Sequence, residues 1–73
     1  MKEIEFTLPR GAGGQAAQHC AYHITREVNE LAERLKLQPK RTIRNYKLIY
    51  TFEQDSDLTL FALCWQGRSY RVV

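Results

Sequence analysis

The sequence is poor in cysteine, and it has neither a long apolar run nor the residue order of a secretion signal. Two cysteines, Cys20 and Cys64, are too few for a disulfide framework or for a zinc site of four thiolates. Both stand among apolar residues, so we expect buried, reduced thiols. No apolar run approaches the roughly 20 residues that span a bilayer. Residues 2–8 alternate polar and apolar side chains, unlike a signal peptide. We therefore predict a cytoplasmic protein without a membrane partner.

Signals of catalysis are also missing from the sequence. Ser56 and Ser69 have no histidine near them along the chain, and the carboxylates of Asp55 and Asp57 flank a polar turn. A nucleophile needs an adjacent base, and an acid–base pair needs carboxylates in unlike environments. We therefore predict that the chain is not an enzyme, that it has no catalytic residues and that it takes no cofactor.

Two motifs have spacings that resemble ligand sites. His19 and His23 are four residues apart, on one face of a predicted helix, but no glutamate follows the first histidine as in zinc proteases. We predict no metal site. Residues 11–16 fit the pattern G-x-G-x-x-A, yet one strand–helix–strand unit is too little for a dinucleotide fold. A flexible turn is the favoured interpretation. Whether the histidine pair or the turn at Gly11–Gly14 binds any ligand stays open.

The periodicity of apolar residues predicts one strand, one long helix and three further strands. Residues 2–8 alternate with a period of two and predict a strand with Ile4, Phe6 and Leu8 on one face. From Gln15 to about Leu37 the apolar residues recur every three or four positions, which is typical of a helix. Beyond Pro39 we predict strands at 42–54, 58–65 and 68–73, with a tight hairpin turn at Gln66-Gly67.

This element order predicts the fold class. With 44% hydrophobic and 26% charged residues, the 73 residues are typical of one globular domain, residues 1–73. We predict an α+β fold in which a single long helix packs on one face of a four-stranded, mainly antiparallel sheet. One helix can cover only one face of such a sheet, so the other face is expected to stay open.

The charge of the chain is concentrated in one segment, Arg34–Lys47, which contains no acidic residue. Its six basic residues leave five basic and eight acidic residues elsewhere, so the remainder sums to −3 while the whole chain is +3. A local positive field of this kind attracts anionic partners. We call these six residues the basic patch: Arg34, Lys36, Lys40, Arg41, Arg44 and Lys47.

The segment 58–65 is apolar at almost every position, as in a strand buried on both faces. Because no second layer is predicted, its outer side chains are expected to form an exposed apolar surface, which is typical of an interface. We predict a partner-binding surface made of Phe61, Leu63, Trp65, Ile49, Lys47 and Arg71.

Together these features predict a small non-catalytic protein-binding module, an adaptor or inhibitor. It would bind a protein with an acidic surface, or form a homodimer through its open sheet face, with the basic patch steering the encounter. The alternative is a nucleic-acid-binding protein that uses the basic run and the aromatic residues of the sheet face.

Overall fold

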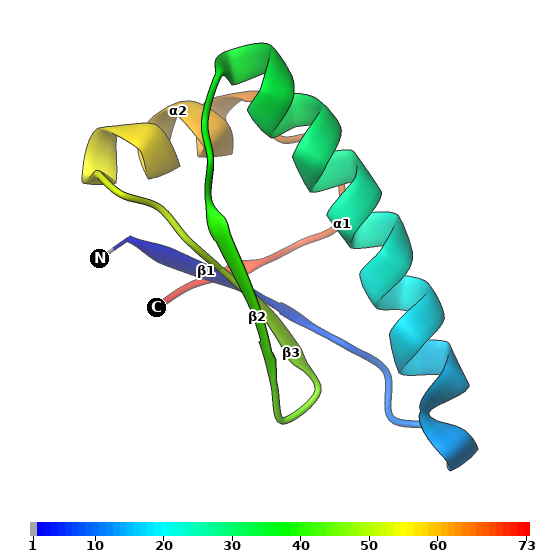
Figure 1. The fold of residues 1–73 in the computed structure, drawn as a ribbon. Helices are drawn as coiled ribbons and strands as arrows, with labels where there is room; N and C mark the ends of the chain where they lie inside the picture. Colours follow the sequence, from blue (N-terminus) through cyan, green and yellow to red (C-terminus); the bar gives the residue numbers. More distant parts are fainter. Residues whose placement is uncertain (1) are drawn as a thin grey trace.

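The computed structural model describes residues 2–73, apart from the side chain of Ala12. The elements follow in the order β1 (Glu3–Thr7), a 3-10 turn η1 (Ala12–Gly14), α1 (Gln15–Leu35), β2 (Lys40–Arg44), β3 (Lys47–Thr51), α2 (Asp55–Cys64) and β4 (Arg71–Val72). The strands form one sheet in the order β2-β3-β1-β4, and every neighbouring pair is antiparallel (Figure 1). The predicted fold class is confirmed: one long helix lies on a four-stranded antiparallel sheet in an α+β fold.

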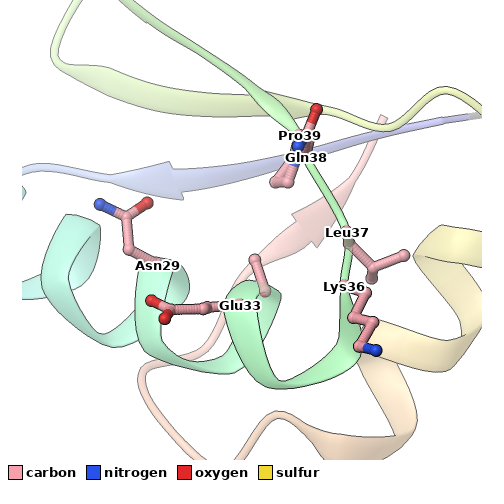
Figure 2. A pocket seen from close by; sticks show the side chains of 7 residues that line it. Asn29, Glu33, Lys36, Leu37, Gln38 and Pro39 are labelled. Carbon is pink, nitrogen blue, oxygen red and sulfur yellow. The ribbon is translucent and has the colours of Figure 1, made fainter.

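Glycines begin α1 and a lysine ends it. Gly13 and Gly14 have φ of 77° and 71°, a left-handed conformation that a residue without Cβ adopts at no steric cost. At the other end Lys36 is itself left-handed, with φ of 60°, and Leu37 donates its backbone N–H to the carbonyl of Ala32 over 2.8 Å. This geometry closes the helix two residues earlier than the sequence pattern predicts. The chain then runs through Gln38 and Pro39 into β2 (Figure 2).

The single strand predicted for residues 42–54 is wrong, because the chain forms a hairpin there. Asn45 and Tyr46 have φ of 51° and 58° and make a two-residue turn between β2 and β3. Left-handed residues at both turn positions match the right-handed twist of the flanking strands, and asparagine tolerates this conformation better than most residues. The inward positions of β3, Leu48 and Tyr50, are buried.

The strand predicted for residues 58–65 is also wrong, because this segment belongs to the helix α2. Asp55 and Asp57 lie in its first turn, where carboxylates are stabilised by the positive end of the helix dipole. Leu58 and Phe61, three residues apart, are its buried positions. The same apolar residues fit a period of two and a period near 3.6, and packing on the core selects the helix.

The predicted strand 68–73 is shortened to Arg71–Val72, and the turn at Gln66-Gly67 joins no hairpin. β4 pairs with β1, with Ile4 opposite Val72, so the three later strands do not form the predicted meander. Gly67 is instead required by a close approach, since a Cβ there would stand 2.5 Å from Cζ2 of Trp65. The absence of a side chain lets the indole ring lie against the backbone.

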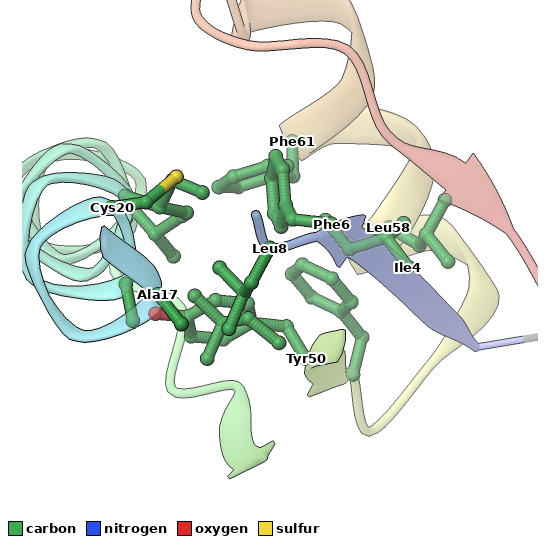
Figure 3. Packing of buried hydrophobic residues seen from close by; sticks show 13 residues of the cluster. Ile4, Phe6, Leu8, Ala17, Cys20, Tyr50, Leu58 and Phe61 are labelled. Carbon is green, nitrogen blue, oxygen red and sulfur yellow. The ribbon is translucent and has the colours of Figure 1, made fainter. Parts of the chain in front are cut away.

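Both helices pack on the same face of the sheet and share one core with it. Ile4 lies beside Leu58 of α2, Ala17 and Cys20 of α1 lie on the other side of the core, and Phe6 and Leu8 lie between them (Figure 3). The aromatic rings contact one another in a chain: Phe6 packs edge-on against the indole of Trp65, which stacks on Phe61. Within the described part of the chain, no helix is long and apolar enough to cross a membrane.

Candidate functional site

The basic patch follows the end of α1, the whole of β2 and the start of β3. Arg34 and Lys36 are exposed at the end of α1, and Lys40, Arg41 and Arg44 are exposed on β2. Lys47 is half-buried on β3. All five residues of β2 are exposed, and β2 is an edge of the sheet. The six predicted residues therefore lie at the end of α1, along the edge strand β2 and at the start of β3, on more than one face of the molecule.

The two faces of β2 carry different side chains. Thr42 pairs with Ile49 and Arg44 pairs with Lys47, so Lys40, Thr42 and Arg44 share the face turned away from the helices. Arg41 and Ile43 pair with the buried Tyr50 and Leu48 and therefore lie on the helix face. Ile43 keeps 53% of its surface exposed, because α1 packs over the centre of the sheet and leaves its edge uncovered.

Positive charge is dense at the hairpin turn. Arg44 and Lys47 stand directly opposite each other across the two strands, a like-charge pair that costs stability. The Lys47 ammonium is balanced in part by the carboxylate of Glu5, 3.2 Å from Nζ to Oε1. The guanidinium of Arg10 lies 5.0 Å from the centre of the Tyr46 ring, in a cation–π contact. Arg44 is thus the cation of this turn best placed for an anionic partner.

A polar cluster lies between α1 and β2, and sequence reasoning missed it. Arg41 donates a hydrogen bond from Nη1 to the Thr25 hydroxyl of α1 over 3.2 Å. Tyr50, opposite Arg41 in the register, is buried, and its hydroxyl has no hydrogen-bond partner among the described residues. Burial raises the pKa of Tyr50, and Thr25 and Arg41 beside it oppose that rise. The tyrosine on an otherwise apolar strand face was the one sequence signal that pointed here, since buried hydroxyls usually find partners.

A shallow hollow lies ahead of the start of β2. Its volume is about 600 Å³, and it lies between the last turns of α1 and the segment that leads into the strand. Asn29 and Glu33 project from the helix side, and Gln38 and Pro39 lie on the strand side (Figure 2). Its lining begins at Asn29, one helical turn after Thr25, and includes neither Arg41 nor Tyr50.

The predicted apolar partner-binding surface is not assembled. Phe61 is fully buried and Ile49 is 4% exposed, so neither offers a contact surface. Trp65 is half-buried against Phe61 and donates its indole N–H to the carbonyl of Arg68 over 2.8 Å. Leu63 is 80% exposed on α2. Phe61 and Leu63 do not share a surface because residues 55–64 are helical, and a helix turns residues two positions apart to different sides.

The two remaining residues of that predicted surface, Lys47 and Arg71, do lie on the open face of the sheet. Their register partners place Lys47 beside Thr7 and Arg71 beside Glu5, on the face turned away from the helices. Glu5 is 8% exposed there and pairs with Lys47. The open face is therefore predominantly polar, in contrast to the apolar face that the strand assignment predicted.

The histidine pair and the cysteines do not form a metal centre in the structure. His19 and His23 lie on one helix face as predicted, with their Nε2 atoms 3.2 Å apart. No group of three or more potential metal ligands gathers anywhere in residues 2–73 as described. Cys20 is buried as predicted, whereas Cys64 is exposed because α2 turns it outward.

No protein family model, curated protein sequence or solved structure matches this chain.

Proposed function

We propose that this chain is a small non-catalytic protein-binding module, an adaptor or inhibitor, that recognises an acidic protein through the basic patch along β2. The observation that carries the proposal is an edge strand whose five residues are all exposed and of which three are basic. Unpaired strand edges bind other chains readily, and basic side chains on the edge select an acidic one. Two free cysteines, one of them exposed, favour a reducing compartment such as the cytoplasm.

The same charges argue against self-association through β2. Two copies paired along this edge would bring Lys40, Arg41 and Arg44 of each chain next to those of the other. Like charges opposite each other destabilise strand pairing, and basic residues on edge strands commonly prevent it. An acidic partner therefore fits the edge better than a second copy does.

Binding of nucleic acid is the second candidate function. Its support is the hairpin turn, where the half-exposed Tyr46 stands between Arg44 and Lys47 and could stack on a base while the cations meet phosphates. Phe61 is no stacking platform, because it lies in the core. We rank this candidate second because the hairpin turn offers a single aromatic residue, Tyr46, which is a small platform for single strands.

A capture experiment with two matched double variants separates these candidates. Lys40→Gln/Arg44→Gln and Arg26→Gln/Arg68→Gln both lower the net charge by two, but only the first pair lies on β2. Arg26 is exposed and its ion pair with Glu30 spans 3.7 Å, so its loss costs little stability. We expect the native chain and the control variant to retain the same acidic protein from the source cells, with or without nuclease. We expect the β2 variant to lose it.

Two outcomes contradict the proposed function. Capture that disappears after nuclease treatment assigns the basic patch to nucleic acid. Equal capture by the β2 variant and the control shows that the patch does not select the partner. In the nucleic-acid case, the logarithm of the affinity should fall linearly with the logarithm of salt concentration, with a slope set by the number of phosphate contacts.

A further inference from the structure

The backbone of β2 has an unpaired edge at two defined residues. Leu8 donates its N–H to the carbonyl of Tyr46, and Phe52 donates to Lys2, so the even-numbered residues of β3 bond to β1. The backbone N–H and C=O groups of the odd-numbered residues of β3 therefore point toward β2, where these residues pair with Lys40, Thr42 and Arg44. By this alternation the N–H and C=O groups of Arg41 and Ile43 point away from β3, toward the open edge.

A strand added at this edge would place its side chains beside the polar cluster. In an antiparallel pair, a residue bonded to Arg41 lies opposite it and puts its side chain on the same face of the sheet. On that face Arg41 meets Thr25 of α1, and the Tyr50 hydroxyl beneath them has no partner among the described residues. An extended segment on β2 would therefore direct every second side chain into the space between β2 and α1.

The chemistry of this space favours a carboxylate. A guanidinium and a protonated phenol are hydrogen-bond donors, the threonine hydroxyl can also donate, and a carboxylate accepts several such bonds at once. Burial raises the pKa of Tyr50, so its hydroxyl remains a donor at neutral pH.

We propose that β2 accepts an extended acidic segment of the partner protein as a fifth, antiparallel strand, and that one carboxylate of this segment binds Arg41, Thr25 and Tyr50. The proposal rests on the proposed function and adds to it the mode of binding and the residues that select the ligand. In this mode backbone hydrogen bonds hold the segment while alternate side chains determine specificity. The antiparallel direction follows the three strand pairs already in the sheet.

Synthetic peptides test the added strand on the native protein. The probe is a capped octapeptide of alternating glutamate and threonine, titrated calorimetrically beside a peptide with glutamine in place of glutamate. We expect the glutamate peptide to bind at least tenfold more tightly. Two further peptides carry N-methyl groups, on the glutamates alone or on the threonines alone. Methylated glutamates should lower the affinity at least tenfold and methylated threonines less than threefold, because only residues opposite Arg41 and Ile43 bond to β2.

A pair of tyrosine variants tests the polar cluster. Tyr50→Phe removes only the unpartnered hydroxyl, so we expect a melting temperature no lower than that of the native protein. Its affinity for the glutamate peptide should fall at least fivefold, and its affinity for the glutamine peptide should change less than twofold. Tyr46→Phe is the control, since it removes the hydroxyl of a half-exposed tyrosine in the turn and should leave binding unchanged.

Several results would overturn this inference. Equal affinities of the two methylated peptides refute strand addition, and so does a glutamate peptide that does not bind. If Tyr50→Phe binds the glutamate peptide with unchanged affinity, the proposed carboxylate site is refuted. The capture experiment with Lys40→Gln/Arg44→Gln and its control does not depend on any of these results. Failure of this inference is therefore distinguishable from failure of the proposed function.

Discussion

Replacing Phe61 and Leu63 separately tests whether residues 55–64 form the helix α2. In the structure Phe61 is fully buried and packs on Phe52 and Trp65, whereas Leu63 is 80% exposed, more than any other large apolar residue in the described part of the chain. In a strand, two residues at this spacing would share a face and respond alike. In the helix they lie on different sides, so the two substitutions should have very different effects on the free energy of unfolding.

The size of the expected difference follows from burial. Phe61→Ala removes a buried aromatic ring and leaves a cavity, which typically costs about 3–5 kcal/mol. Leu63→Ala removes an exposed side chain and should change stability by less than about 0.5 kcal/mol. A domain of this size has roughly 4–11 kcal/mol of stability in total, so Phe61→Ala brings the protein close to unfolding. Phe61→Leu, with an expected cost of about 1–1.5 kcal/mol, keeps the comparison measurable.

Urea unfolding followed by the fluorescence of Trp65 measures all three variants. Trp65 stacks on Phe61, with ring centres 5.3 Å apart, so its emission reports directly on this part of the core. We expect the ranking of destabilisation to be Phe61→Ala, then Phe61→Leu, then Leu63→Ala. Equal costs for Phe61→Ala and Leu63→Ala, or a larger cost for the latter, would refute the helical assignment of this segment.

Three further predictions follow from the backbone and from one buried hydroxyl. Lys36→Gly should raise the free energy of unfolding by about 0.5 kcal/mol, because glycine relieves the left-handed strain at φ of 60°; a lower melting temperature would contradict this. Gly67→Ala should cost about 1–3 kcal/mol and shift the Trp65 emission to the red, because the new Cβ would stand 2.5 Å from the indole. Since the folded-state pKa of Tyr50 lies above its ordinary value of 10, the unfolded chain loses this proton first as pH rises. Stability should therefore fall above about pH 10, and Tyr50→Phe should lessen that fall if Tyr50 is its source.

The fold class was predictable because long periodic segments leave little ambiguity. The spacing of Ala17, Cys20, Ile24 and Val28 over about three helical turns fits only a helix, and all four are buried. The alternation of Ile4 and Phe6 in β1 is equally clear. These patterns identify which face of each element meets the core, and that is enough to predict a helix lying on a sheet.

The errors arose where a short apolar segment fits two periods. Residues 58–64 are apolar at six of seven positions, so the sequence alone does not distinguish a strand from a helix. The aspartates at 55 and 57 are typical of a polar turn, but they also suit the first turn of a helix. The turn at Asn45-Tyr46 was missed because it contains no glycine or proline, and only the register of β2 on β3 reveals it.

The candidate site was predictable in its charge but not in its geometry. The run without acids identified the basic patch, whose residues lie at the end of α1, on β2 and at the start of β3. The prediction that Phe61, Leu63 and Trp65 share an exposed surface depended on a strand at residues 58–65. It is wrong because this segment is helical as far as Cys64. The contact of Arg41 with Thr25 joins residues 16 positions apart, which no local pattern reveals.

Amide hydrogen exchange at Arg41 and Ile43 tests the central claim most directly. The account predicts rapid exchange of these two amides in the free protein, because both point toward the open edge of β2, and slow exchange of the Thr42 amide, which faces β3. Addition of the acidic partner, or of the glutamate–threonine peptide, should slow exchange at Arg41 and Ile43 at least tenfold. Protection of both amides in the free protein, or an unchanged exchange rate in the complex, would contradict the assignment of β2 as the binding edge.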